Sequence, residues 1–227
     1  MIGLSVGEVK NCAELYTCGQ SISGVYTIDP DGLGAFDVYC DQTTAGGGWT
    51  VIQKRVDGTM NFNLTWNDYK KGFGDFLIRE FWLGLDKIQR LTQNKTENEL
   101  RVDLGVTANK SVYAEYKWFG IENETANYTL HIGSFSNSST VHDSLTRHNG
   151  MLFYTWDSSP AYHDCTSFGG GWWYWKTCHA PDSNLNGIYS HGNTSINQIR
   201  WARLNHGSAE DTAPKTTEMK IRRKDFL

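Results

Sequence analysis

Two neighbouring stretches of alternating apolar and polar residues constrain the fold more than any other feature of this chain. In Glu99–Leu104 and in Val112–Phe119, apolar residues occupy every second position. A period of two residues indicates strands that bury one face. Because only the short segment Gly105–Lys110 separates them, the two strands are predicted to pair antiparallel. The chain is therefore expected to contain an antiparallel sheet that packs on a core.

Five further strands are predicted to accompany this pair. They lie at Gly24–Ile28, Ala35–Cys40, Trp49–Gln53, Asn127–Ile132 and Thr217–Arg222. Trp49–Gln53 is apolar on both faces apart from Thr50 and the terminal Gln53, which is typical of a central strand that is covered on each side.

Helices are predicted beside these strands. In Thr65–Gly72, Thr65 can cap the first turn, Asp68 stands at the capping-box position, and Gly72 can end the helix. A second amphipathic helix is expected over Asp86–Leu91, and a short one around Ala13–Tyr16. Because strands and helices do not alternate regularly, the predicted fold class is α+β.

Regular periodicity fades after about Asn149, and turn residues dominate up to about Pro214. A loop-rich segment of this length is unusual inside a compact domain unless it is functional or cross-linked. Its centre, Phe153–Tyr189, concentrates aromatic residues, three successive glycines and two cysteines. We expect Trp172 and Trp173 to be loop core, and we place the binding surface in this segment.

Charge, apolar run length and sequence motifs argue against several classes of function. The net charge is -4, and the basic residues are dispersed apart from Arg222–Lys224, so we expect no nucleic-acid partner. No apolar run is long enough for a membrane span, and the first residues lack the pattern of a signal peptide. No His-Glu-x-x-His motif is present, and the cysteines are expected in disulfides, so a non-enzymatic function is predicted.

Two features of the sequence indicate a secreted glycoprotein. Five cysteines occur without any Cys-x-x-Cys pair, which favours disulfides, with one cysteine left over. Seven Asn-x-Ser/Thr acceptor motifs are present, although a polar, Asn-rich surface would also produce some of them by chance. These motifs begin at Asn63, Asn94, Asn109, Asn123, Asn127, Asn137 and Asn193.

Several long motifs in order resemble the fibrinogen-like C-terminal domain of fibrinogen chains, ficolins, tachylectins, tenascins and angiopoietin-like proteins. The resemblance covers essentially the whole chain. The motifs are NCAELY from Asn11, SGVYTI from Ser23, FDVYCDQTTAGGGWTVIQKR from Phe36, EFWLGLDKI from Glu80, HNGMLFYTWD from His148, GGWWYW from Gly170 and TEMKIR from Thr217.

This resemblance implies one domain over residues 11–227, after an extension of residues 1–10. It implies a small N-terminal lobe at about 11–50, a central antiparallel sheet with two flanking helices at 51–148 plus 217–224, and a loop-rich binding subdomain at 149–216. It also implies disulfides Cys12–Cys40 and Cys165–Cys178. Cys18 is then either a buried free thiol or an interchain link.

A calcium site beside the binding pocket is also implied by the resemblance. Its ligand positions fall on Asp157, Ser159, Ala161 and His163. Since only Asp157 is a carboxylate, the set suits calcium poorly, because this ion gains affinity from ligand charge. Asp164 is a possible substitute ligand, and the alternative is that Asp157 and Ser159 cap a turn.

In the lectin-like members of this family, a neighbouring pocket binds acetyl groups with aromatic walls and backbone N–H groups. Carried over by position, the implied pocket residues are Thr177, Cys178 and His179, with Tyr174 and Tyr189 nearby. For His179, the alternative is an imidazole that is hydrogen-bonded in the core. Trp175 is our candidate for an exposed platform. One extra residue before Cys178, and a longer loop after His179, depart from the family pattern and would reshape this pocket.

The leading hypothesis is a secreted, lectin-like module that binds acetylated or other glycans in innate pattern recognition. The alternatives are a receptor-binding ligand domain of the angiopoietin-like type and a matrix-adhesion module as in tenascins. Because a single domain of this kind binds weakly, an oligomer formed through an upstream segment is expected.

Overall fold

The structure is a computed structural model that describes residues 9–76, 80–94, 97–158, 169–175, 182–189, 198–204 and 213–226. Its α-helices are α1 (Cys12–Thr17), α2 (Trp66–Lys71) and α3 (Leu85–Leu91). Its strands are β1 (Gly24–Ile28), β2 (Phe36–Asp41), β3 (Trp49–Arg55), β4 (Phe73–Asp75), β5 (Glu80–Trp82), β6 (Asn98–Thr107), β7 (Lys110–Tyr116), β8 (Phe119–Ile121), β9 (Leu130–Ile132), β10 (Phe153–Tyr154), β11 (Trp172–Trp173), β12 (Ser183–Asn184), β13 (Arg200–Trp201) and β14 (Thr216–Arg223).

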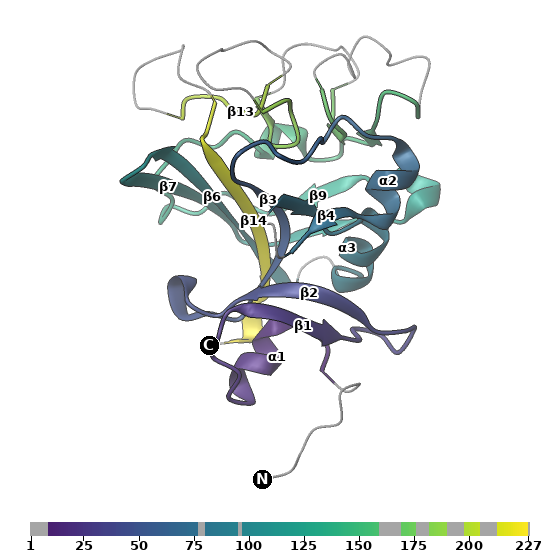
Figure 1. Ribbon diagram of the computed structural model, residues 1–227, viewed down its shortest axis with the longest axis vertical. Coiled ribbons are helices and arrows are strands. Elements are labelled where there is room, and N and C mark those ends of the chain that lie inside the picture. The colour runs from purple at the N-terminus through teal and green to yellow at the C-terminus, as the bar shows by residue number, and fades with distance from the viewer. Residues whose placement is uncertain are drawn as a thin grey trace.

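A central antiparallel sheet organises the fold, and its strand order is β1-β2-β3-β14-β6-β7, with β5 on β3 and β4 on β5. The last strand, β14, lies between β3 and β6, so that Glu218 stands opposite both Lys54 and Asp103. Figure 1 shows β14 running from the loop end of the molecule to the lobe formed by α1, β1 and β2. The predicted return of this segment to the sheet is confirmed.

The sheet buries the face that the alternating pattern predicts. Leu100, Val102 and Leu104 are fully buried on β6, and Ala114 is fully buried on β7. The central strand β3 is buried at almost every position, which confirms that it is covered on both faces. The α+β class is thus confirmed.

Helix α2 begins and ends where the sequence predicts. The Thr65 hydroxyl accepts from the Asp68 N–H, and the Asp68 carboxylate accepts from the Thr65 N–H, so the capping box is complete. Gly72 ends the helix at φ 95°, and a Cβ at this position would lie 2.3 Å from the carbonyl oxygen of Leu83. Only glycine combines that backbone angle with so close an approach.

The predicted strand over Val112–Phe119 is in fact divided. β7 ends at Tyr116, and β8 begins at Phe119 and pairs with β9 in a separate two-stranded sheet. Between them the Trp118 carbonyl accepts from the Gly133 N–H at 2.7 Å. The Trp118 ring fills the space where a side chain at Gly133 would stand. The alternation of apolar and polar residues in the sequence continues to Trp118, which is why the pattern does not reveal this bend.

The N-terminal lobe is cross-linked by the Cys12–Cys40 disulfide, as predicted, which joins α1 to β2. Both cysteines are fully buried. Cys18 is free and exposed, so the prediction of a buried thiol is wrong. Its position explains this, because Cys18 is the C-cap residue at which the chain leaves α1. An interchain link through Cys18 stays a prediction.

The loop-rich segment contains little regular structure where the structure describes it. Two-residue ladders join β10 to β11 and β12 to β13. Trp172 and Trp173 are fully buried, in line with their predicted place in the loop core. Cys165 and Cys178 lie outside the described residues. Within the described part of the chain, no helix is long and apolar enough to span a membrane.

Candidate functional site

Arg55, at the end of β3, anchors the base of the loop-rich segment. Its Nη1 donates to the carbonyl oxygen of Gly187 at 2.8 Å and lies 3.4 Å from that of Leu185. The guanidinium lies 3.8 Å from the Phe62 ring centroid, and it is almost fully buried. Arg55 therefore fixes the turn after β12 to the central sheet.

Glu80 on β5 compensates the charge of Arg55. Its Oε1 lies 3.6 Å from the Arg55 Nε. The same carboxylate accepts the backbone N–H groups of Val56, Gly58 and Met60. Burial opposes ionisation, but these N–H groups and Arg55 together hold the pKa of Glu80 below its ordinary value. Burial lowers the pKa of Arg55 to about 10, against the attraction of Glu80, so both groups are charged at neutral pH.

An aromatic cluster supports the loops above this ion pair. The Trp173 ring packs edge-on against Phe153 at 5.2 Å, and its Nε1 donates to the carbonyl oxygen of Tyr128 at 2.9 Å. Tyr174, a predicted pocket residue, is only 2% exposed. Its hydroxyl lies 2.8 Å from the carbonyl oxygen of Gly170 and accepts from the Asn184 amide. The Tyr174 hydroxyl therefore joins the backbone of Gly169 and Gly170 to Asn184 on β12.

Trp175, the predicted platform, is half-buried. Its Nε1 donates to the carbonyl oxygen of Arg147 at 3.1 Å. The Arg147 guanidinium lies 4.6 Å from the Trp175 ring centroid and forms an ion pair with Asp182 at 3.0 Å. These three side chains place a flat apolar ring beside one charge of each sign.

Tyr189 is the second predicted pocket aromatic that the structure describes. Its hydroxyl lies 2.9 Å from the carbonyl oxygen of Val56 and 2.8 Å from that of Lys215. Its ring leaves no room for a side chain at Gly58. Tyr189 thereby connects the loop-rich segment to the ends of β3 and β14. Thr177, Cys178 and His179 lie outside the described residues.

Asp157 is the one predicted calcium ligand that the structure describes. It is exposed, and its Oδ1 accepts from the Trp66 N–H at 2.9 Å and from the Thr155 hydroxyl at 2.7 Å. Asp157 thus caps the first turn of α2. Ser159, Ala161 and His163 lie outside the described residues. Among the residues that are described, no group of three or more His, Cys, Asp or Glu side chains could hold a metal ion, and the one available carboxylate is a poor fit to calcium.

Trp156, which the sequence analysis did not single out, is 50% exposed next to Asp157. The antiparallel register of β10 and β11 puts Trp156 and Trp175 beyond opposite ends of this ladder. No sequence signal separates Trp156 from the buried tryptophans nearby, because all of them stand among aromatic residues. Trp156 thus provides exposed aromatic surface beyond the end of the ladder opposite to the half-buried Trp175.

A family profile described as "Fibrinogen beta and gamma chains, C-terminal globular domain" matches residues 8–224. The chain belongs to this fibrinogen C-terminal domain family. The predicted resemblance is therefore confirmed. Domains of this family are non-enzymatic recognition modules, so the chain is a fibrinogen-like recognition domain and not an enzyme.

Named relatives agree with this membership. The chain is 43% identical to Ryncolin-4 of Cerberus rynchops over 95% of its own length and 61% of that protein. It is 39% identical to Fibrinogen C domain-containing protein 1 of Xenopus tropicalis, over 94% of its own length and 47% of that protein. The chain thus spans about half to three fifths of the length of these curated relatives.

Solved structures show the same fold. The fibrinogen-like globe domain of human ANGPTL6 superposes with a TM-score of 0.83 at 35% identity, and the alignment covers 98% of this chain and 99% of that one. A lamprey fibrin D-dimer, complexed with the peptide ligand Gly-His-Arg-Pro-amide, superposes with a TM-score of 0.75 at 31% identity, covering 96% of this chain and 74% of that one.

The predicted glycosylation motifs of this fibrinogen-like domain lie on its surface where they are described. The asparagine side chains at five of them are exposed, and that of Asn127 is partly exposed. The exposed five are Asn63, Asn94, Asn109, Asn123 and Asn137. Asn193 lies outside the described residues. These five exposed asparagine side chains are therefore accessible for modification.

Proposed function

We propose that this fibrinogen-like domain is a secreted, lectin-like recognition module that binds acetylated or other glycans through the surface between Asp157 and Tyr189, as in innate pattern recognition. The observation that carries the proposal is the half-buried Trp175 ring, which lies beside the ion pair of Arg147 and Asp182. A flat ring offers apolar contact to an acetyl methyl group, and Arg147 and Asp182 beside Trp175 supply a donor and an acceptor.

Secretion is supported by two features of the chain. The buried Cys12–Cys40 disulfide is stable in an oxidising compartment. The exposed acceptor motifs fit the same environment. Attachment of glycans at these motifs is tested by the loss of mass after enzymatic deglycosylation of the secreted protein, and an unchanged mass would contradict it.

A thermal-shift series tests glycan recognition. We expect N-acetylglucosamine to raise the melting temperature, and glucose, which lacks the acetyl group, to have a smaller effect. Trp175→Ala should remove the response. The matched control is Leu33→Ala, because Leu33 is 77% exposed in the turn between β1 and β2, away from Trp175 in the sequence and the fold. A melting temperature that no sugar changes would overturn the proposal.

Calcium is tested in the same series. Asp157 is the one described ligand candidate, and its Oδ1 already accepts two hydrogen bonds. We expect calcium and a chelator to leave the melting temperature almost unchanged. A stabilisation by calcium that Asp157→Asn abolishes would instead establish a calcium site and identify Asp157 as one of its ligands.

A second candidate function is recognition of a protein ligand, as in a receptor-binding domain. One observation favours it, because the lamprey fibrin structure with the same fold is complexed with a peptide. Gly-His-Arg-Pro-amide is the probe. A melting temperature that rises with the peptide and not with either sugar would support peptide recognition and contradict the glycan proposal, whereas a response to the sugar alone would contradict peptide recognition.

A further inference from the structure

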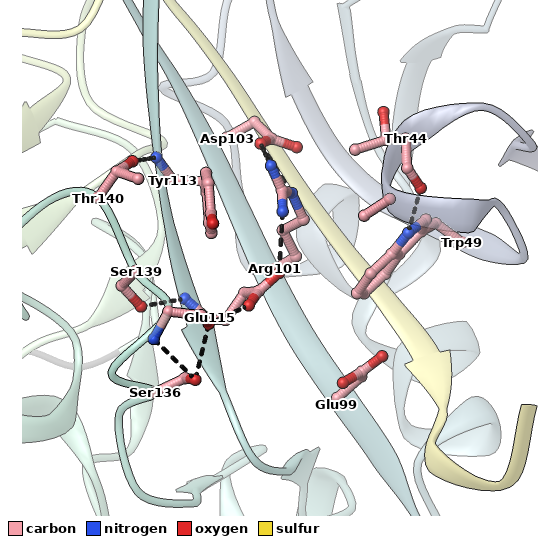
Figure 2. Close-up of polar contacts among 12 residues, drawn as sticks. Thr44, Trp49, Glu99, Arg101, Asp103, Tyr113, Glu115, Ser136, Ser139 and Thr140 are labelled. Atoms are coloured by element: carbon pink, nitrogen blue, oxygen red, sulfur yellow. Dashed lines mark hydrogen bonds and ion pairs between the residues drawn. The ribbon is translucent and has the colours of Figure 1, made fainter. Parts of the chain in front are cut away.

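The central sheet ends at β1 on one side and at β7 on the other. Residues 135–140 close the β7 edge, as Figure 2 shows around Tyr113 and Glu115. The Thr140 N–H donates to the carbonyl oxygen of Tyr113 at 2.9 Å, and the Ser136 N–H donates to that of Glu115 at 2.8 Å. In the described part of the chain, β1 pairs with β2 alone. One edge of the path is closed, and the other has no second strand on it among the described residues.

The backbone groups of β1 that face outward can be assigned. The Asp29 N–H donates to the carbonyl oxygen of Val9, which lies on the side of β1 away from β2. Because successive N–H groups of a strand point to alternate sides, those of Val25 and Thr27 point the same way as that of Asp29. Both side chains are exposed. This leaves a short, accessible template for another strand.

Surface chemistry distinguishes the two edges. Of the five large apolar side chains that are exposed in the described residues, three lie in the lobe, namely Ile22, Val25 and Leu33. Asn109, in the turn between β6 and β7, and Asn137, in the segment that closes β7, are glycosylation motifs at the closed edge. None of the seven motifs lies before Asn63. Glycans would thus shield the closed edge and leave β1 accessible.

We propose that a second copy of this chain pairs with the β1 edge, antiparallel and with the twofold axis at Val25. Val25 then lies opposite the partner's Val25, and Ser23 lies opposite the partner's Thr27. The register of β1 with β2 puts Tyr39 beside Val25. The exposed face therefore gains a continuous row of Tyr39, Val25 and the same two residues of the second copy, which contributes apolar cross-strand contacts.

The position of the axis follows from Val9. Val9 occupies the outward side of Asp29, so a strand whose Ser23 stood opposite Asp29 would collide with it. With the axis at Val25, the residue opposite Asp29 is Ser21, where the chain has already turned, since the Ser21 N–H donates to the carbonyl oxygen of Gly19. The pairing uses the same surface on both copies, so it closes into a dimer and does not extend into a fibre.

Sedimentation equilibrium of the 227-residue chain with and without reductant tests this dimer. We expect a reductant-resistant dimer whose dissociation constant rises at least about tenfold in Val25→Lys, because two like charges then face each other at the axis. Val25→Pro should also dissociate it by removing an outward N–H. Leu33→Lys adds the same charge to the lobe outside the pairing and should leave the dimer intact.

Hydrogen exchange provides a second readout that does not depend on the variants. The amides of Val25 and Thr27 should gain protection as the protein concentration rises, whereas the protection of the Gly32 amide, which donates to the Asp29 carboxylate in the turn, should not change. A monomer at every concentration would overturn the proposal. So would a dimer that is insensitive to Val25→Lys, or one that is lost in Cys18→Ser or on reduction, because Cys18 would then hold the two copies together.

Discussion

The imidazole Nδ1 of His148 lies 2.7 Å from the carbonyl oxygen of Trp173, and its Nε2 lies 3.2 Å from the backbone nitrogen of Ser183. A carbonyl oxygen can only accept and a backbone N–H can only donate, so the ring is neutral with its hydrogen on Nδ1. His148 is fully buried and joins β11 to β12. It connects the two short ladders beneath the proposed binding surface.

Acidification should destabilise the protein through His148. Burial lowers the pKa of His148 from 6.5 to about 4, with opposing contributions from the Trp173 carbonyl and Asp182. The neutral ring contributes its full stability above pH 6.5, and this contribution is lost as the pH falls toward about 4. The total loss is about 3 kcal/mol in the free energy of unfolding.

Urea unfolding at a series of pH values measures this loss. His148→Gln keeps a donor and an acceptor but does not titrate, so its unfolding free energy should vary less with pH in this window. The carboxylates of Asp143 and Asp182 and the Arg147 guanidinium are the charges near the ring, and they are the same in both proteins. Equal pH dependence in the wild type and the variant would contradict the role of His148.

Removing the charge of Glu80 should unfold the base of the loops. Glu80→Gln leaves Arg55 as an uncompensated buried cation, and breaking a buried ion pair in this way costs about 3 to 5 kcal/mol. Glu124→Gln is the matched control, since the Glu124 side chain is 45% exposed in its ion pair with Lys70, and we expect little change there. Chemical denaturation compares the two, and equal stabilities would show that the buried pair is unimportant.

Loss of the lobe disulfide should destabilise the fold. Cys12 and Cys40 are 28 residues apart, and closing such a loop contributes about 3 to 4 kcal/mol by restricting the unfolded chain. Replacing both with Ala should lower the free energy of unfolding by about this amount. Cys18→Ser, which alters an exposed thiol, should change it by less than about 0.5 kcal/mol. Similar effects of the two replacements would contradict this assignment.

Two tryptophans of the loop-rich segment should differ sharply in how much they contribute to the stability of the fold. Trp173→Ala removes a fully buried ring and should cost about 3 to 5 kcal/mol. Trp156→Ala removes a half-exposed ring and should change stability by about 0.5 kcal/mol or less. Thermal and urea denaturation of both variants provide the comparison. A large loss in Trp156→Ala would mean that its ring is structural and not free for a ligand.

Local signals in the sequence were sufficient for most of the scaffold. The period-two pattern of Glu99–Leu104 identifies a strand because one face is buried, and Thr65, Asp68 and Gly72 specify α2 because capping is a local interaction. The end of β7 at Tyr116 could not be predicted, since it depends on the contact of Trp118 with Gly133, which is distant in the sequence.

The residues that support the candidate site were the hardest to predict from the sequence. Arg55, Glu80 and His148 resemble ordinary polar residues in the sequence, and their roles depend on partners from other elements. Tyr174 was predicted beside the pocket by its position in the family pattern, and in the structure its hydroxyl donates toward the carbonyl oxygens of Gly169 and Gly170. Aromatic residues of core and surface are alike in sequence, and only packing separates Trp173 from Trp156.

Saturation-transfer NMR of N-acetylglucosamine with the deglycosylated chain tests recognition at the loop end most directly. We predict transfer to the acetyl methyl protons that is stronger than transfer to the ring protons, that Trp175→Ala abolishes, and that Leu33→Ala preserves. Absence of transfer in the folded wild-type protein, or transfer that Trp175→Ala leaves intact, would contradict glycan recognition at this surface.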